Sequence, residues 1–309
     1  ITNEDNGTYI LDNLSLGTYT ISFTKSGFND ASMSATLATD NQTVTANVTL
    51  LANTCSAGTV SGKITDAVTS ANVDNASINA RSGLNVTSGS TTGTTTTATN
   101  GTYTLSSMSA GGYTVEVNKS GYITTYFNVN VCGNLTNQNA SMSEQLSSGT
   151  MRIVLSWPSG STADDLDSHL EIPDNASSTS HVYFIKATFY YAKNGNTCSS
   201  CSSDQLSDNV TLDRDDDDGA PGTETITITK VRSGTYSYSV ADYDHLSSAS
   251  STVLSKSGAS VKVYYNNTTT TFNVPNSAGA LWRVFTFTTS GGLIASGNMS
   301  SASNSGNVY

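Results

Sequence analysis

The chain has 309 residues, and its 24 acidic residues outnumber the 13 Lys and Arg residues to give a net charge of −11. This excess of negative charge argues against nucleic acid or an anionic membrane as a partner. Only 12% of the residues are charged, so solubility must come from hydroxyl and amide groups, as in secreted β-proteins. No run of about 18 apolar residues occurs, so we expect no transmembrane helix. The first residues also lack a signal peptide, as in a processed or truncated secreted chain.

An internal repeat opens the chain. The paired segments are 6–11 with 100–105, 17–23 with 111–117, and 25–28 with 119–122. In the second motif Tyr19, Ile21 and Phe23 alternate with hydroxyl residues, which predicts a strand with one apolar and one polar face. Glycines separate the motifs and indicate turns.

The second copy is longer on its N-terminal side, where two further strands are predicted at 58–66 and 73–81. These strands and the repeat motifs resemble the carboxypeptidase regulatory-like domain, a small transthyretin-like β-sandwich. The motifs that carry the resemblance are VSGKITD at 60–66, ASI at 76–78, NGTY at 100–103, GGYTV at 111–115 and KSGY at 119–122. The resemblance covers one whole copy and the later half of another, and it implies a spacer module of secreted or surface proteins.

Cys55 precedes the first strand of the complete copy, and Cys132 ends its last. Four cysteines allow three pairings, and this placement favours a Cys55–Cys132 bridge. Such a bridge would contribute roughly 4 kcal/mol to stability on the chain-entropy account. It would also imply an oxidising compartment.

From about residue 148 the pattern changes to longer strands around an acidic stretch. The segments DDLDSH at 164–169, 212–226, GTYSYSV at 234–240, Pro275 and WRVF at 282–285 resemble the YfaP-like domain, a family of secreted bacterial and archaeal β-sandwiches. The resemblance covers about 148–290 and implies an extracellular context.

The densest charge lies at 212–224. The candidate ligands there are Asp213, Asp215 and Asp217 at alternating positions, followed by Glu224 after a turn of glycine and proline. Alternating carboxylates, a sharp turn and a later glutamate suit a hard cation such as Ca²⁺. The spacing departs from an EF-hand loop, and the turn is longer than in the YfaP-like family, so the role of Glu224 stays open. The alternative is a solvated acidic loop.

A second acidic segment precedes the loop. If residues 164–170 are extended, Asp165, Asp167 and His169 share one face of a strand. We therefore expect Asp165, Asp167 or Glu224 to complete the shell of a Ca²⁺ ion bound by the acidic stretch.

Cys198 and Cys201 form a short motif with three interpretations. A redox pair needs a βαβ unit that is not visible, and a zinc site needs two more ligands, for which His169 and His181 have no fixed spacing. We favour a loop disulfide. With His245 these are the only histidines, too few to assign acid–base roles, and no nucleophile elbow is present, so we expect no enzyme activity.

Asn-X-Ser/Thr sequons are frequent, but a chain this rich in Ser and Thr would contain many by chance. Glycosylation is therefore permitted rather than shown. The candidates are Asn75, Asn85, Asn134, Asn175, Asn209 and Asn267.

The sequence thus predicts an all-β chain of tandem β-sandwich domains. The domains are a partial carboxypeptidase regulatory-like sandwich at 1–53, a complete one at 54–147, a larger YfaP-like sandwich at 148–290 and a Ser/Gly/Asn-rich tail at 291–309. We expect a structural subunit of an extracellular fibre, stalk or surface layer of a prokaryote. The alternatives are a calcium-dependent adhesin that binds protein or glycan, and a non-catalytic appendage of a secreted hydrolase.

The first copy lacks the opening strands of its sandwich. An unpaired edge and an apolar groove would then invite pairing with another chain. Either a longer chain that begins before Ile1 completes the sandwich, or a neighbouring subunit donates a strand, for which the 289–309 tail is one candidate. Head-to-tail donation would build an open homopolymer. The apolar face consists of Tyr9, Leu11, Tyr19, Ile21 and Phe23.

Overall fold

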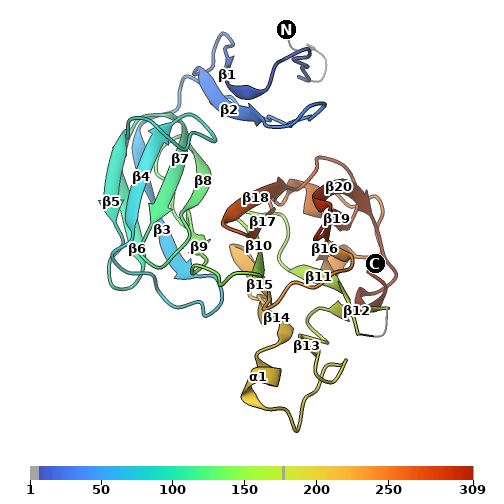
Figure 1. The fold of residues 1–309 in the computed structure, drawn as a ribbon. Coiled ribbons are helices and arrows are strands. Elements are labelled where there is room, and N and C mark those ends of the chain that lie inside the picture. The colour runs from blue at the N-terminus through green and yellow to red at the C-terminus, as the bar shows by residue number, and fades with distance from the viewer. Residues whose placement is uncertain (1–6, 176–177, 309) are drawn as a thin grey trace.

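The computed structural model describes residues 7–175 and 178–308, and positions 1–6 of the predicted 1–53 domain lie outside that range. Within the described residues the helices are single turns and strands make up the rest of the regular structure, so the predicted all-β fold is confirmed. Figure 1 shows an N-terminal hairpin, a middle sandwich and a larger C-terminal sandwich in sequence order. No helix of the described part is long and apolar enough to cross a membrane.

The N-terminal hairpin consists of the antiparallel strands β1 (Gly17–Phe23) and β2 (Ala31–Leu37). Apolar side chains of both strands pack with Leu84 of the middle sandwich. Met33 and Leu84 form a parallel bridge, and the amide of Ser34 donates to the carbonyl of Leu84 at 2.8 Å. The hairpin is therefore anchored to the middle sandwich through β2.

The middle sandwich, residues 54–147, packs a three-stranded sheet in the order β6-β3-β9 against a four-stranded sheet in the order β5-β4-β7-β8. Inward side chains alternate along the strands, as on β7, where Tyr113, Val115 and Val117 are buried. The strands are β3 (Gly58–Asp66), β4 (Ser77–Ser82), β5 (Gly93–Thr96), β6 (Thr102–Met108), β7 (Gly111–Asn118), β8 (Thr125–Val131) and β9 (Ala140–Met142). A Cys55–Cys132 disulfide joins the segment before β3 to the end of β8.

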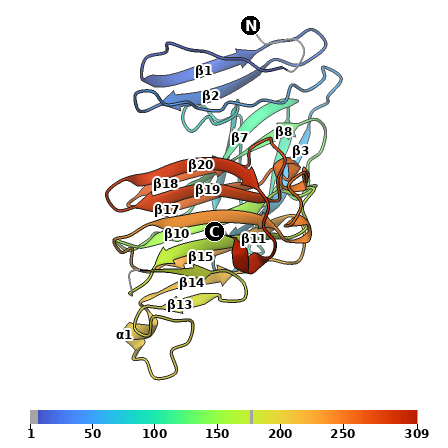
Figure 2. The ribbon, with the colours of Figure 1, turned by 90° about the vertical axis from the view of Figure 1, so that its right-hand side faces the viewer.

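The C-terminal sandwich, residues 148–308, packs a six-stranded sheet in the order β13-β14-β15-β10-β17-β18 against a five-stranded sheet in the order β12-β11-β16-β19-β20. Figure 2 shows these layers seen from the side, with β20 and β18 nearest the hairpin. The strands are β10 (Met151–Trp157), β11 (Leu166–Pro173), β12 (Thr179–Val182), β13 (Thr188–Tyr190), β14 (Asn209–Arg214), β15 (Gly222–Ile228), β16 (Tyr236–Asp242), β17 (Ser260–Tyr265), β18 (Thr268–Asn273), β19 (Leu281–Thr288) and β20 (Gly292–Ser300). The helical turns are α1 (Ser203–Leu206), η1 (Tyr243–His245), α2 (Val253–Lys256) and η2 (Ser305–Asn307).

The predicted tail at 291–309 belongs to the C-terminal sandwich, which corrects the expected boundary at residue 290. Residues 292–300 form β20, which pairs with β19. Leu293 and Met299 pack against the core, and Val308 is buried in a small apolar cluster beside the same sheet. Since burying these side chains stabilises the segment where it lies, it is not free to serve as a donated strand.

Hydrogen bonds fix the C-terminal sandwich against the middle one. Thr225, on the outer face of β15, donates its hydroxyl to the carbonyl of Ala67 at 2.6 Å. The ammonium group of Lys262 donates to the hydroxyl of Thr125 and to the carbonyl of Tyr126, both at 2.8 Å. Burial lowers the pKa of this lysine to about 8. Another relative orientation would leave the ammonium group without these acceptors, which is costly for a desolvated charge.

We predict that Gly222→Ala destabilises the C-terminal sandwich. Gly222 pairs with Trp157 across β15 and β10, and a Cβ at this position would stand 1.9 Å from Cζ2 of Trp157. Because the buried indole must move, we expect a loss of about 1–3 kcal/mol in the free energy of unfolding, measured by denaturant titration. Gly195→Ala is the control, since its nearest heavy atom would be 3.8 Å away, and an equal loss there would contradict this explanation.

Candidate functional site

A glutamate faces the interior of the C-terminal sandwich. Glu224 on β15 is 1% exposed, and the alternate residues Ile226 and Ile228 belong to the core. Thr223 and Thr225 face the other way and hydrogen-bond to the middle sandwich. Strand alternation thus places a carboxylate in an apolar layer, where it is costly unless it is bonded or paired.

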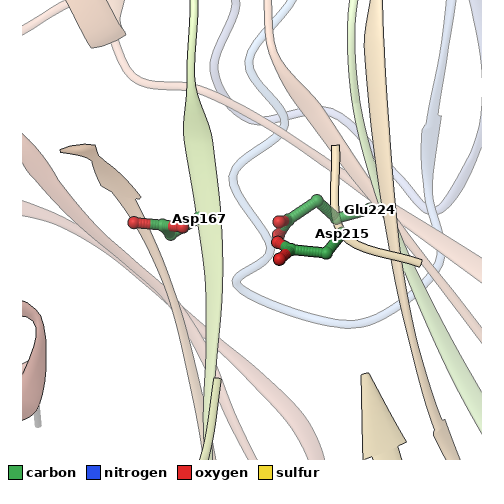
Figure 3. Close-up of side chains that lie close together, drawn as sticks. All are labelled: Asp167, Asp215 and Glu224. Carbon is green, nitrogen blue, oxygen red and sulfur yellow. The ribbon is translucent and has the colours of Figure 1, made fainter. Parts of the chain in front are cut away.

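Three carboxylates converge at this position. Single oxygens of Asp167, Asp215 and Glu224 all lie within 4.8 Å of one another. The amide of Ser168, on β11 of the opposite sheet, donates to Oε2 of Glu224 at 2.5 Å. Figure 3 shows the carboxylates of Asp215 and Glu224 side by side, pointing toward the strand that carries Asp167. Among the described residues no donor reaches Oε1 of Glu224 or Oδ2 of Asp167, although both atoms are buried.

Burial raises the pKa values of two carboxyl groups of this cluster, Asp167 and Glu224, and that of the neighbouring Asp165. Burial, reinforced by the charges of Asp165 and Asp215, raises the pKa of Asp167 to about 8. Burial, followed by contact with Asp215, raises the pKa of Glu224 well above its usual value. Burial and the surrounding aspartates raise the pKa of Asp165 to about 6. Without a cation the carboxyl group of Asp167 therefore stays largely protonated at neutral pH, because burial and the neighbouring charges disfavour its ionised form.

The structure brings together three of the six predicted ligands: Asp167, Asp215 and Glu224. Asp165 and Asp217 lie outside this group, although the charge of Asp217 acts on Asp165. The contribution of Glu224, left open by the sequence, is central in the structure. An alternation signal could have shown this, because Glu224 shares its face with two core isoleucines.

Asp213 points away from the cluster, which corrects the expectation that the acidic stretch alternates throughout. The pairing register of β14 shifts between Leu212 and Arg214. A bulge adds a residue to one strand, so side chains before and after it no longer share a face. Asp213 instead interacts with Thr227 and with the charge of Arg152, while burial raises its pKa.

Asp216 organises the loop that presents the cluster, a role that the sequence did not reveal. Its Oδ2 accepts a hydrogen bond from Nη2 of Arg214 at 2.6 Å and from the amide of Thr223 at 3.0 Å. These bonds join the two ends of the acidic loop across its base. They fix the backbone on either side of Asp215 and just before Glu224. Arg214, the only arginine within residues 212–224, was the one feature of the sequence that could have indicated this role of Asp216.

The ligand set suits a hard cation. All three converging side chains offer carboxylate oxygens, the donors that Ca²⁺ prefers. No histidine or cysteine belongs to this group in the described chain. Three carboxylates within one small volume would repel strongly if ionised without a counter-charge. The residues present therefore fit Ca²⁺, which would supply the missing counter-charge.

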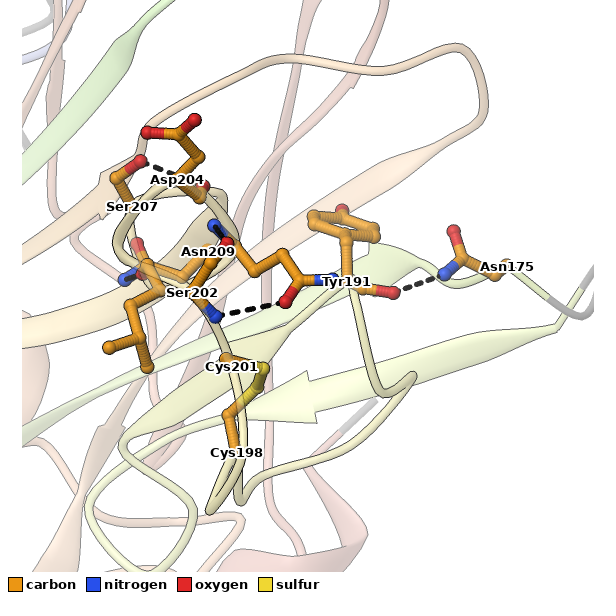
Figure 4. The surroundings of a disulfide bond; sticks show 10 residues. Asn175, Tyr191, Cys198, Cys201, Ser202, Asp204, Ser207 and Asn209 are labelled. Atoms are coloured by element: carbon orange, nitrogen blue, oxygen red, sulfur yellow. Dashed lines mark hydrogen bonds between the residues drawn. A yellow bond between two sulfur atoms is a disulfide. The ribbon is translucent and has the colours of Figure 1, made fainter.

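The Cys198–Cys201 pair forms a disulfide at the tip of a loop that extends from the sandwich (Figure 4). Directly after it, Ser202 caps helix α1, and Gln205 reciprocates in a capping box. Because both sulfurs are bonded to each other, neither is available to zinc. The two histidines considered for that site contact each other instead, with 3.0 Å between Nδ1 of His169 and Nε2 of His181.

The N-terminal hairpin reproduces the geometry of β7 and β8. Gly17 pairs with Leu37 in the hairpin, and Gly111 pairs with Val131 in the middle sandwich. The displacement is the same for both partners (111 − 17 = 131 − 37 = 94). Gly17 and Gly111 also share a φ of 153°. The internal repeat is thus a repeat of backbone conformation as well as of sequence.

One edge of the hairpin lacks a partner. In the middle sandwich β7 lies between β4 and β8, whereas among the described residues β1 pairs only with β2. An unpaired row of backbone N–H and C=O groups is a template for another strand. Large apolar side chains are also exposed in the segment that precedes β1, namely Ile10, Leu11, Leu14 and Leu16. The described part of the chain thus has the open edge that the repeat predicted.

The glycosylation candidates differ in exposure. Asn209 is half-buried and donates its amide nitrogen to the carbonyl of Leu206 at 2.8 Å. The other five are exposed, so glycosylation stays a prediction for them; they are Asn75, Asn85, Asn134, Asn175 and Asn267.

Comparison with known families supports the interpretation of the middle sandwich. The carboxypeptidase regulatory-like domain matches residues 59–143, so the chain contains a domain of this kind. The prediction is confirmed for the complete copy, while the YfaP-like resemblance of 148–290 stays a prediction. No curated protein matches the chain.

Several solved structures share parts of this arrangement. A mutant type II Cohesin-X-Dockerin complex from Acetivibrio cellulolyticus is 23% identical, covering 28% of this chain and 56% of that chain with a TM-score of 0.22. A putative carbohydrate binding protein from Bacteroides uniformis is 8% identical over 70% of this chain and 98% of that chain, with a TM-score of 0.24. The major pilin SpaD from Corynebacterium diphtheriae is 13% identical over 70% and 64%, with a TM-score of 0.25. The chain spans little more than half the length of the first of these, and TM-scores this low carry no argument about function.

Proposed function

We propose that this chain is a structural subunit of an extracellular fibre, stalk or surface layer, assembled by strand pairing between copies. The observation that carries the proposal is the open edge of β1, which pairs only with β2 in the described chain. Two disulfides support an oxidising, extracellular setting. Strand addition at such an edge forms main-chain hydrogen bonds and buries apolar side chains together. The role of the chain in this proposal is mechanical rather than catalytic.

Light scattering and electron microscopy of the purified 309-residue chain test the assembly. A subunit of this kind forms concentration-dependent linear polymers, because a head-to-tail contact between two different surfaces repeats from copy to copy without closing. Particles with a regular axial repeat are the expected result. A monomer at every concentration, together with isolated particles in material from the producing cells, would contradict the proposal.

We propose, as a separate step, that Asp167, Asp215 and Glu224 bind Ca²⁺. The carrying observation is Oε1 of Glu224, buried without a donor and close to two other carboxylates. A bound cation would give that oxygen a partner and favour the ionised form of all three groups. Asp215 and Asp217 are exposed, whereas Asp165 is half-buried, so further oxygens or water could complete the shell from the side of Asp215 and Asp217.

Calorimetric titration with CaCl₂ tests the site. Asp215→Asn removes one ligand charge and should weaken binding by about tenfold or more. Asp218→Asn is the matched control, because it makes the same charge change on an exposed residue of the same loop. No heat with the unaltered chain, or equal weakening by both variants, would exclude this site.

A calcium-dependent adhesin is the second candidate function, and the same carboxylate cluster favours it. Under this alternative the ion stabilises loops that contact a protein or glycan. A glycan array probed with and without Ca²⁺ separates the two, since a fibre subunit binds no glycan whether or not the ion is present.

A further inference from the structure

The strand that carries Glu224 also carries a contact between the two sandwiches. Glu224 faces the carboxylate cluster, while its two neighbours on β15 face the middle sandwich. Thr223 accepts a hydrogen bond at 3.3 Å from the hydroxyl of Ser141 on β9, and Thr225 donates to the carbonyl of Ala67 at 2.6 Å. Because successive side chains of a strand point to opposite faces, this short stretch of β15 joins the cluster to the domain interface.

The other end of the acidic loop reaches the same interface. Asp213 interacts with Thr227 and with the charge of Arg152. Arg152 donates from Nε to the hydroxyl of Thr227 at 3.0 Å, and from Nη1 to the hydroxyl of Ser143 at 2.9 Å. Ser143 directly follows β9 of the middle sandwich and is buried. Both ends of the loop that carries Asp215 are therefore connected to the middle sandwich.

The carbonyl that Thr225 contacts lies in a buried apolar cluster between the sandwiches. Ala67 packs there with Val154 of β10 and Tyr264 of β17. A carbonyl buried in such surroundings is costly to leave without a donor. A movement of β15 that withdraws Glu224 from the carboxylate cluster would break this hydrogen bond and open the apolar contact around it.

The carboxylate cluster favours such a movement when no cation is bound. Among the described residues no donor reaches Oε1 of Glu224 or Oδ2 of Asp167, although both atoms are buried, and close carboxylates repel one another when they ionise. Asp215 is exposed, so a shift of the acidic loop toward solvent relieves the repulsion. That shift pulls on the ends of the loop that contact the middle sandwich. A bound cation removes the repulsion and keeps the loop in place.

We propose that Ca²⁺ bound by Asp167, Asp215 and Glu224 fixes the orientation of the C-terminal sandwich relative to the middle one, so that the ion stiffens the junction between them. This inference rests on the Ca²⁺ site proposed above, and it adds a mechanical role for the ion within the subunit. Coupling of this kind is reciprocal, because an intact junction must strengthen ion binding by the factor by which the ion strengthens the junction. Loss of a junction contact should then weaken binding although no ligand is altered.

Thr225→Val tests this reciprocity in the full chain. The substitution keeps the shape of the side chain but removes the hydroxyl that donates to Ala67. Calorimetric titration with CaCl₂ should show binding weakened by about fivefold or more. Thr229→Val is the matched control, because the hydroxyl of Thr229 donates to the carbonyl of Asn209 within the C-terminal sandwich. This control removes a comparable hydrogen bond and leaves the junction intact, so the affinity for Ca²⁺ should not change.

Spin labels measure the junction itself. Cysteines for the labels replace Thr104 of β6 and Ser296 of β20, which are both exposed. Pulsed electron paramagnetic resonance then gives the distribution of distances between the sandwiches in CaCl₂ and in EDTA. The distribution should be narrower in CaCl₂ than in EDTA. Adding Thr225→Val should broaden it even at a saturating concentration of CaCl₂, whereas adding Thr229→Val should not.

The outcomes separate the junction from the ion site. A broader distribution in EDTA, together with weakened binding in Thr225→Val alone, supports the proposal. Ca²⁺ binding that leaves the distribution unchanged, or equal weakening of binding by both variants, overturns the stiffening while the ion site stands. No heat of binding with the unaltered chain removes the ion site and this inference with it.

Discussion

Replacing both Cys55 and Cys132 by serine is expected to lower the free energy of unfolding of the middle sandwich by roughly 4–5 kcal/mol. The two cysteines are 77 residues apart in sequence, so the bond removes much of the freedom of the unfolded chain. It also connects the two sheets, because Cys55 precedes β3 in one and Cys132 follows β8 in the other. Hydrogen exchange of the most protected β7 amides, followed with increasing denaturant, measures the loss in this domain alone.

Serine at Cys198 and Cys201 is the matched control. These cysteines are only three residues apart, so the same account gives about 2 kcal/mol at most. The effect should also stay local, because helix α1, which directly follows this disulfide, has no buried residue. If the Cys198 and Cys201 variant destabilises the C-terminal sandwich as much as the Cys55 and Cys132 variant destabilises the middle one, the loop-length explanation is wrong.

Strand periodicity in the sequence was sufficient to predict the fold class and the repeat. Tyr19, Ile21 and Phe23 lie at alternate positions of β1, and the register that their repeat implied is the register observed in β7. Local alternation determines which face of a strand is apolar, and that information is contained within a few residues.

The tail was predicted poorly for the same reason. Residues 292–300 contain few apolar side chains, and most of β20 is exposed, so alternation gives little signal. Only pairing with β19 makes this segment a strand, and a partner distant in sequence cannot be read from the segment itself.

The candidate metal site was half predictable. Asp167 follows from alternation, because each position on a strand has a defined face. The role of Glu224 was left open, although the same alternation with Ile226 and Ile228 could have placed it. Asp213 does not follow from alternation, because the bulge after Leu212 changes the phase without any glycine or proline to mark it. Convergence of β11 with β15 depends on how the two sheets pack, which no local pattern contains. The hydrogen bonds of Lys262 to the middle sandwich are equally non-local.

Calcium is expected to raise the melting temperature of the C-terminal sandwich strongly at pH 8 and hardly at all at pH 4. The pKa of Asp167 is raised from 3.8 to about 8 in the fold, that of Asp165 to about 6, and that of Glu224 well above 4.5. A carboxyl group with a raised folded pKa binds more protons folded than unfolded. In chelator, the stability that it contributes is full below about pH 4 and is lost as the pH rises toward 8.

Calcium is expected to reverse this loss, because the proposed site would bind it through ionised carboxylates in competition with protons. At a free concentration one hundred times the dissociation constant, binding contributes about 2.7 kcal/mol, or roughly 5–10 °C for a domain of this size. Differential scanning calorimetry in EDTA and in CaCl₂ from pH 4 to pH 8 measures the difference. Glu224→Gln removes one buried charge yet keeps an oxygen for the amide of Ser168. It should therefore melt higher than the unaltered chain in EDTA at pH 8 and respond little to calcium. A melting temperature of the unaltered chain that is flat with pH in EDTA would mean that these carboxyl groups are not the buried acids described here.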